Sequence, residues 1–266
     1  MKVVNYGREL FKGTATYYAR YRPMYPSSLI RFLVYKFSLD GSGRMLDLGC
    51  GTGQLTCRFS DWFDEIVGID MEPEMIEEAK RISTETRVEN IDWYIGELDT
   101  YTDNFKQTFR LVTIAKAFHW MDREKVLADL YELVDNGGGV AIIDHYNPSQ
   151  EPLRWQKKVT SLVKQWYGAE RRAGKTTYNH PKMTHEEVVS QSNFELEIHK
   201  LPAYEQKWTI ASILGNLYST SYGNKRFLGE NVKAFEDNLK DELLKINPTG
   251  IFKEQIDLSV ILALKK

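Results

Sequence analysis

The sequence predicts an α/β protein with a Rossmann-like, doubly wound sheet, and two neighbouring patterns support this. The apolar run Met45–Leu48 is typical of a buried strand and leads directly into a loop with three alternating glycines. A second apolar run, Ile66–Ile69, ends in the acid Asp70, about 20 residues further on. Between them, Gln54–Phe63 places apolar residues at helical spacing. Strand, glycine loop, helix, strand and acid make the first half of a nucleotide-binding fold.

The loop glycines Gly49, Gly51 and Gly53 suit a bound nucleotide. Glycine allows a sharp turn and lets a ligand approach the main chain closely. The following helix N-terminus offers unpaired N–H groups, and Asp70 can accept the hydroxyls of a ribose. An ordinary strand–turn–helix without a ligand is the alternative, and the complete pattern makes it the weaker one.

The glycine spacing distinguishes between kinds of nucleotide. A dinucleotide site requires Gly-x-Gly-x-x-Gly, whereas this loop reads Gly-x-Gly-x-Gly. Asp47, just before the loop, would repel a pyrophosphate but suits a ligand with an ammonium group. The run Leu46–Gly53, Leu-Asp-Leu-Gly-Cys-Gly-Thr-Gly, resembles the first motif of class I S-adenosylmethionine-dependent methyltransferases. The resemblance implies a seven-stranded sheet with helices on both faces and S-adenosyl-L-methionine as the cofactor. Cys50 is expected as a small residue packed beside the ligand, and a nucleophilic thiol at the helix N-terminus is the alternative.

Composition and charge narrow the function classes further. The 266 residues are 42% hydrophobic and 27% charged, with a net charge of −2, which is ordinary for a globular protein and gives no sign of nucleic-acid binding. No apolar run reaches the roughly 18 residues of a membrane span, and no signal peptide is evident. The two cysteines, Cys50 and Cys57, are not expected to pair and show no zinc pattern, so we expect a cytoplasmic protein.

Residues 1–43 are expected to form an N-terminal lid segment. The stretch from Tyr18 to Pro26 reads Tyr-Ala-Arg-Tyr-Arg-Pro-Met-Tyr-Pro, and its prolines must end any helix there. It resembles a segment of trans-aconitate methyltransferase-like small-molecule methyltransferases. That resemblance implies that Tyr18 and Tyr21 cover the methionyl end of the cofactor and that Arg22 meets its carboxylate. A surface segment held by its aromatic side chains is the open alternative.

Residues 44–145 are expected to form the cofactor-binding core. Further strands are expected at Asn90–Ile95, Leu111–Ala115 and Val140–Asp144, with helices from Pro73 and over Arg123–Val134. The resemblance implies that several residues at the strand ends contact the cofactor, with core packing left open for the first of them. These residues are Met71, Glu97, Leu98 and Ala115.

The stretch after the fourth strand is expected to face the reaction centre. Phe118-His119-Trp120 resembles the Gln-Ala-Phe-His-Trp of the same group, with Lys116 in place of the glutamine. His119 suits a general base for a hydroxyl or ammonium acceptor. If the acceptor is a carboxylate, no base is needed, and Lys116, Arg22 or His119 would position it by charge. A purely structural role for His119 stays open.

The second half alternates less regularly between strands and helices. Residues 146–200 are expected to form an inserted helical cap that supplies the acceptor pocket. His180 and His185 have a metal-like spacing but no supporting ligand set, so we expect no metal. Residues 201–266 are expected to complete the core. Expected there are paired strands Phe194–Leu201 and Tyr204–Ile210, helices Ala211–Thr220 and Val232–Lys245, and an edge strand Ile256–Leu264.

Together these patterns predict methyl transfer to an oxygen or nitrogen of a small organic acceptor, a carboxylate included, with no nucleic-acid or membrane partner. Two other functions stay open. An NAD-dependent oxidoreductase would use the same half-fold, and a non-catalytic protein could bind the nucleoside alone. Neither the acceptor nor the oligomeric state follows from the sequence.

Overall fold

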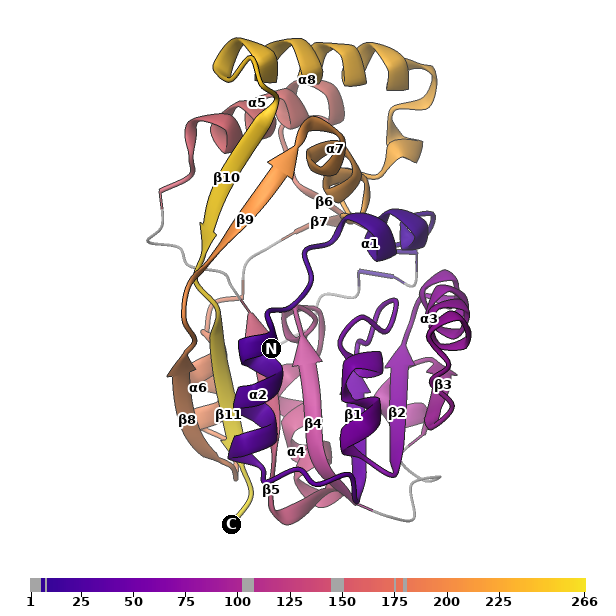
Figure 1. Cartoon of the computed structure of the whole chain (residues 1–266), viewed down its shortest axis with the longest axis vertical. Helices are drawn as coiled ribbons and strands as arrows, with labels where there is room; N and C mark the ends of the chain where they lie inside the picture. Colours follow the sequence, from indigo (N-terminus) through magenta and orange to yellow (C-terminus); the bar gives the residue numbers. More distant parts are fainter. Residues whose placement is uncertain (1–5, 8, 102–107, 145–150, 175, 179–180) are drawn as a thin grey trace.

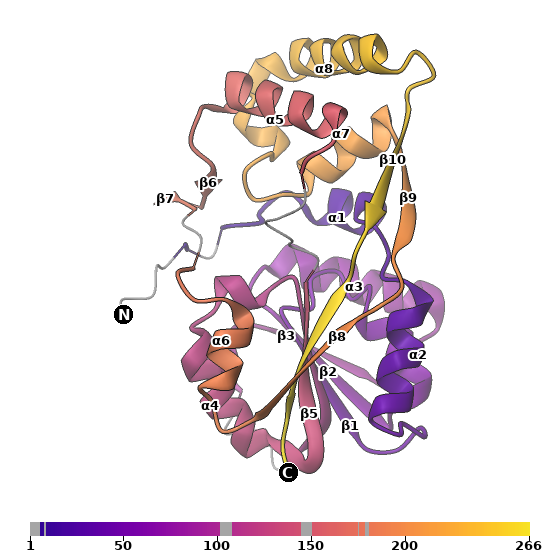
Figure 2. The same cartoon turned by 90° about the vertical axis from the view of Figure 1, so that its left-hand side faces the viewer.

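The computed structural model describes residues 6–7, 9–101, 108–144, 151–174, 176–178 and 181–266. In the described part, a large sheet flanked by helices forms one layer system, and a smaller layer of helices lies beyond one end of its strands (Figures 1 and 2). The Rossmann-like α/β fold is therefore confirmed.

The main sheet has seven strands in the order β3-β2-β1-β4-β5-β11-β8. The first five are parallel to one another, and β11 is antiparallel to both of its neighbours. The strand order reverses between β1 and β4, which is where such sheets bind ligands. The bounds are β1 (Arg44–Leu48), β2 (Glu65–Asp70), β3 (Ile91–Ile95), β4 (Phe109–Ala115), β5 (Val134–Asp144), β8 (Glu195–Lys200) and β11 (Ser259–Leu264).

Helices cover both faces of this sheet. Apolar side chains of α4 (Arg123–Leu133) and α6 (His185–Ser190) are buried against one face, and those of α2 (Ser27–Lys36) and η1 (Thr56–Trp62) against the other. The helix after the glycine loop was expected to be an α-helix over Gln54–Phe63, but η1 is a 3₁₀ helix.

The second layer joins α5 (Arg154–Tyr167), α7 (Ile210–Tyr218) and α8 (Val232–Ile246) around their own apolar cluster (Figure 1). A two-stranded ribbon of β9 (Tyr204–Thr209) and β10 (Ile251–Ile256) connects this cap layer to the main sheet. The helices expected to complete the core, α7 and α8, thus pack with α5 instead.

Two expectations for the C-terminal strands were wrong. The expected pairing of 194–201 with 204–210 does not occur, because β8 pairs with β11 and β9 pairs with β10. The last strand is not an edge strand, because β11 lies between β5 and β8. Four consecutive residues, Val260–Ala263, are buried in β11, which requires cover on both of its faces.

The short helix α1 (Ala15–Tyr21) links the cap layer to the core. Its Tyr21 ring packs directly on Gly215 of α7. Just before α1, the N–H of Gly13 donates to Glu74 Oε2 of α3 (Pro73–Thr86) at 2.6 Å. On the cap side, the Asn224 amide donates to the Lys12 carbonyl at 2.6 Å. The N-terminal segment is therefore fixed to both layers.

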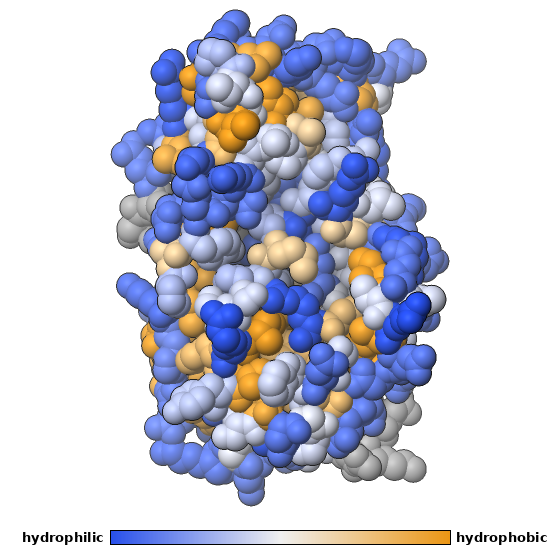
Figure 3. Space-filling model, viewed as in Figure 1, coloured by the Kyte–Doolittle hydropathy of each residue, from blue (hydrophilic) through white to orange (hydrophobic). Residues whose placement is uncertain are grey.

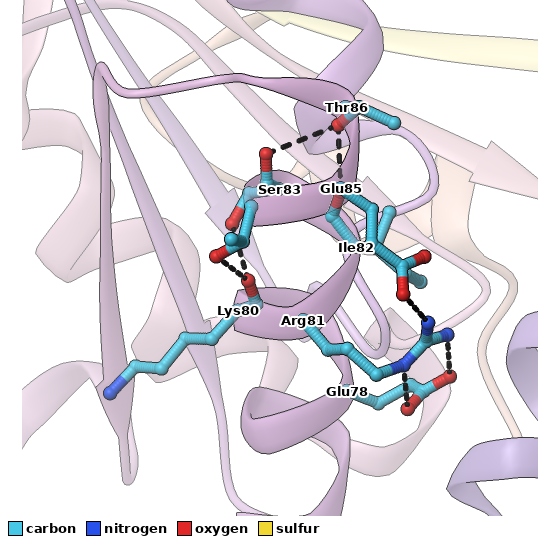
Figure 4. A network of polar contacts seen from close by, with 8 residues as sticks. Glu78, Lys80, Arg81, Ile82, Ser83, Glu85 and Thr86 are labelled. Atoms are coloured by element: carbon cyan, nitrogen blue, oxygen red, sulfur yellow. Dashed lines mark hydrogen bonds and ion pairs between the residues drawn. The ribbon is translucent and has the colours of Figure 1, made fainter.

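The outward surfaces are polar in most places. Arg81 on α3 binds Glu78 at 2.6 Å and also pairs with Glu85, one turn away (Figure 4). Figure 3 shows apolar side chains interrupted by hydrophilic ones over both layers. Within the described ranges, no helix has the length and apolar character that a membrane crossing requires.

Candidate active site

The glycine loop after β1 turns sharply at the reversal point of the sheet. The N–H groups of Gly49 and Cys50 donate to the Ile69 carbonyl at 2.8 and 3.0 Å, which holds the loop beside β2. Gly49 has φ +73°, and a Cβ there would lie 2.5 Å from the Ala117 Cβ. Gly51 has φ +55° and lies against the Tyr18 ring. The loop therefore needs glycine both for its backbone angles and for close packing.

Asp70, at the end of β2, is held by main-chain donors. Its two oxygens accept from the N–H groups of Gly51 at 2.8 Å and Glu72 at 2.9 Å. Burial raises the pKa of this carboxyl, and the main-chain hydrogen bonds oppose that rise. Each carboxylate oxygen has further lone pairs, so the group can still accept the two hydroxyls of a ribose.

Asp47, in β1, is a buried carboxyl between two hydroxyl groups. Thr56 donates to it at 2.5 Å and Thr113 at 2.7 Å. Burial raises its pKa to about 6, against the effect of these hydrogen bonds. No cationic side chain in the described ranges forms an ion pair with Asp47. A buried carboxylate of this kind favours a cationic ligand group.

A narrow cavity lies between the Asp47 carboxyl and helix α1. The residues that line it are Tyr18, Tyr25, Asp47, Gly49, Cys50, Gln54, Leu55 and Ala115. The Gln54 side chain donates to the main-chain carbonyl of Ala19 at 3.2 Å, so the loop also holds α1 in place. The sequence analysis missed this role of Gln54 and missed Tyr25.

Arg22 follows α1 and lies at the boundary between core and cap. Its guanidinium lies over the Tyr18 ring, 4.9 Å from the ring centre, and its Nη2 donates to the Ser219 carbonyl at 3.2 Å. Its Nε is buried and has no hydrogen-bond partner in the described part of the chain. An unpaired buried donor of this kind fits an anionic ligand group, such as the carboxylate of an amino acid.

The other residues expected to contact the cofactor fall into two groups: some can reach a ligand in the structure, and others are packed elsewhere. Tyr18 reaches the glycine loop, whereas Tyr21 packs on α7 instead. Met71 is 38% exposed and Glu97 is exposed, so both can meet a ligand, but Leu98 is buried in the core. Ala115 lines the cavity.

Cys50 also lines the cavity, where it is buried. Burial raises the pKa of its thiol well above the usual range, so the thiolate needed for a nucleophile is disfavoured. This agrees with a small packing residue beside the ligand.

Lys116 comes directly after β4 with φ +55°, an angle that non-glycine residues adopt at a cost. Its ammonium lies 5.6 Å from the centre of the Tyr25 ring. Burial and, to a lesser extent, the charge of Arg22 lower its pKa to about 8, while the charge of Asp144 acts in the opposite direction. The ammonium forms no ion pair among the described residues.

His119 lies in the short helix η4 (Phe118–Trp120), two residues after the turn at Ala117. Its ring lies 4.6 Å from that of Trp120, centre to centre. One ring nitrogen lies within 4.8 Å of both the Asp144 carboxylate and a ring nitrogen of His185. Sequence reasoning missed this group, although the place of Asp144 at the carboxyl end of β5 was a usable signal. His180, the other member of the expected histidine pair, lies outside the described residues.

Comparisons with known proteins agree with this geometry. Residues 45–138 match the family model described as a methyltransferase domain. An uncharacterized methyltransferase of Schizosaccharomyces pombe is 24% identical over 252 residues, which cover 94% of this chain and 93% of that protein. A ubiquinone/menaquinone biosynthesis C-methyltransferase of Citrifermentans bemidjiense is 32% identical, but over 45% of this chain and 52% of that protein.

Solved structures show the same fold. A methyltransferase from Geobacter sulfurreducens, determined with S-adenosyl-L-homocysteine, superposes with a TM-score of 0.54 at 16% identity, covering 97% of this chain and 98% of that one. The fold is that of the class I methyltransferases. Together with the site and the family match, it identifies an S-adenosylmethionine-dependent methyltransferase, with S-adenosyl-L-methionine as its cofactor.

Proposed function

We propose that the chain transfers a methyl group from S-adenosylmethionine to an oxygen or nitrogen of a small organic acceptor that carries an anionic group, a carboxylate included. The environment of the Lys116 side chain supports the proposal that the acceptor carries an anionic group. The charge of Arg22 lowers the pKa of the Lys116 ammonium, and the ammonium forms no ion pair among the described residues. A cation held in this way favours an anion from the ligand.

The residues around the loop fit the cofactor's chemical groups. Asp47 would hold the ammonium and Arg22 the carboxylate of the methionyl end, while Asp70 would accept the ribose hydroxyls. Met71 and Glu97 would lie beside the adenine, whereas Leu98, which is buried in the core, would support the turn from below without meeting the ligand. When bound, the cofactor supplies a methyl group that its sulfonium already activates.

The protein's own contribution is then positioning and exclusion of water. Tyr18 covers the glycine loop and can face a sulfonium with its ring, a favourable cation–π arrangement. Lys116 would hold the anionic group of the acceptor, and His119 would take the proton of a hydroxyl or ammonium acceptor. Holding acceptor and methyl group in line supplies several kcal/mol of the rate enhancement, on the order of 7 or more in favourable cases.

The two alternatives are less well supported. A dinucleotide would place its pyrophosphate against Asp47, and the loop lacks the third glycine that such a site requires. A protein that only binds the nucleoside would not need the unpaired Lys116 ammonium, which lies beyond the cofactor site.

Calorimetric titration of the full chain with S-adenosylmethionine, S-adenosylhomocysteine and NADH tests the cofactor. We expect the first two to bind and NADH not to bind. Asp70→Asn should weaken binding at least tenfold, whereas Asp61→Asn, an exposed control, should not. Preference for NADH would overturn the proposal.

The acceptor is then sought with methyl-labelled cofactor and a panel of small organic acids. Each acid that carries a separate hydroxyl or amino group is paired with its amide, so that the anionic charge is removed while that acceptor atom is kept. Transfer to acids but not to their amides supports the anionic group, and equal transfer to both contradicts it.

A further inference from the structure

Three side chains from distant parts of the sequence meet beside the expected reaction centre. His119 comes from η4, Asp144 from the carboxyl end of β5, and His185 from the first turn of α6. Their ligand atoms lie within 4.8 Å of one another, and His185 Nε2 is 3.7 Å from Asp144 Oδ2. Figure 2 shows α6 beside α4, and apolar side chains of both helices pack in the same core cluster.

Arg123, the first residue of α4, determines which nitrogen of His185 carries the proton. Its Nη1 lies 3.2 Å from His185 Nδ1, and a guanidinium has donors only, so Nδ1 must be the acceptor. In the neutral ring, Nε2 then carries the hydrogen, and it faces the Asp144 carboxylate. Arg123 is itself oriented by the carbonyls of Met183 and Thr184, at 3.0 and 3.3 Å.

This arrangement favours a chain of neighbouring polar side chains over a metal site. Two histidines and one carboxylate are a common set of metal ligands. A metal on His185 Nε2, however, needs the lone pair of that nitrogen, with the hydrogen on Nδ1. That hydrogen would point at the Arg123 guanidinium, a donor facing a donor. Arg123 would have to move before a metal could bind.

We propose that Asp144 and His185 are positioning residues for His119, which acts as the general base of the transfer. Arg123 orients His185, His185 orients the Asp144 carboxylate, and the carboxylate orients and stabilises the His119 ring as it becomes protonated. This inference depends on the proposed function, and it specifies an acceptor atom that must lose a proton: a hydroxyl or an amine, not a carboxylate.

The step balances as follows. The acceptor heteroatom forms a bond to the methyl carbon as the carbon–sulfur bond of the sulfonium breaks, and the electron pair of that bond stays on sulfur. The proton of the acceptor goes to a ring nitrogen of His119. The product is a methylated acceptor, a neutral thioether and a histidinium that returns its proton to water.

Other charged and titratable groups face this chain. Lys116, which follows β4, and Tyr25, which precedes α2, both interact with the charge of Asp144. The Tyr178 ring lies 6.1 Å from that of His119, and the Arg171 guanidinium lies over Tyr178. Asp144 is the carboxylate that the two histidines share, so its charge should govern how strongly His119 holds a proton.

NMR of the full chain labelled with ¹⁵N-histidine tests the proposal without an identified acceptor. Long-range ¹H–¹⁵N spectra report the tautomer, and the five histidines are assigned with single His→Gln variants. We expect the Nε2–H form for His185. Asp144→Asn should lower the titration midpoint of His119 by about 1 pH unit, because a carboxylate charge is lost. Asp61→Asn should leave it unchanged.

The contrary results are equally specific. An Nδ1–H tautomer for His185, or an unchanged His119 midpoint in Asp144→Asn, overturns the chain. Stoichiometric binding of Zn²⁺, from added zinc chloride, that is lost in His185→Gln indicates a metal site and also overturns it. S-adenosylhomocysteine binding is measured on the same samples. If S-adenosylhomocysteine does not bind, the proposed function is contradicted, but the tautomer and titration of the histidines can still be interpreted.

Discussion

Thr56 Oγ1 donates a 2.5 Å hydrogen bond to Asp47 Oδ2 and so ties the helix after the glycine loop to the strand before it. Thr113 donates to the other oxygen, from the neighbouring strand β4. Both partners are neutral, so they orient the carboxylate without compensating its charge. The protein thus keeps a buried, partly desolvated anion in place at a cost in stability, and we propose that a ligand cation compensates its charge.

Asp47→Asn should stabilise the ligand-free protein at pH 7.5. The pKa of Asp47 is about 6 in the folded state, against an ordinary value of about 3.8 in the unfolded chain. Above pH 6 the folded protein carries a charge that the unfolded chain holds more easily, so stability falls as pH rises from about 4 to 6. The neutral amide should therefore raise the free energy of unfolding by about 1–3 kcal/mol at pH 7.5.

Urea unfolding at pH 7.5 and pH 4 measures this effect. The stabilisation should largely disappear at pH 4, where most of the wild-type carboxyl is protonated when folded. A variant that is less stable than wild type at both values would contradict the argument.

The affinity for S-adenosylmethionine should depend on the same carboxyl. Only ionised Asp47 attracts the ammonium of the cofactor, so affinity should fall up to tenfold per pH unit below about 6. Calorimetric titration between pH 5 and pH 7 checks this, in a range below the titration of an α-amino group. Asp47→Asn should bind weakly throughout, with no slope. Parallel curves for the two proteins would rule out the pairing.

The arrangement of the proposed cofactor residues in the fold was predictable because these residues are local in sequence. Asp47, the loop glycines and Asp70 lie within one strand–helix–strand unit, and their order along the chain fixes their order in space. The kind of helix after the loop was not predictable. Its apolar spacing is that of an α-helix, whereas the structure has a 3₁₀ helix there.

The acceptor side depends on contacts between distant elements. Asp144 and His185 meet only because α6 docks beside α4, which no local pattern in the sequence indicates. The last strand was misplaced for a related reason. An apolar run such as Val260–Ala263 predicts a buried strand but does not say which strands lie on either side.

Lys116→Met should raise the KM for the acceptor more than it lowers kcat. The ammonium would bind the anionic group in the ground state and the transition state alike, so its loss weakens binding first. The pKa of Lys116 is about 8, so the wild-type KM should rise as pH increases through 8 and the charge is lost. Steady-state kinetics with an acceptor from the acid panel measure both effects. Binding of S-adenosylmethionine should persist, which controls for folding. An unchanged KM would exclude Lys116 as the anion-binding group.

Gly215→Ala should weaken cofactor binding because it displaces helix α1. A Cβ at this position would lie 2.2 Å from the Tyr21 ring, so α1 must shift away from α7. Overpacking lowers the free energy of unfolding by about 1–3 kcal/mol, and the better helix propensity of alanine offsets up to about 1 kcal/mol of this loss. A shifted α1 moves Tyr18 off the glycine loop and breaks the hydrogen bond from Gln54.

The double variant Tyr21→Ala with Gly215→Ala separates packing from direct contact. If Tyr21 acts only by holding α1, the alanine at 215 should cost much less stability once the ring is gone, because nothing then clashes. Urea unfolding gives the coupling between the two positions, and calorimetry gives the affinity of each variant. Additive stability losses would mean that the two residues do not interact. Coupled losses, with an affinity that follows the stability, would mean that Tyr21 supports the cofactor site from the cap side.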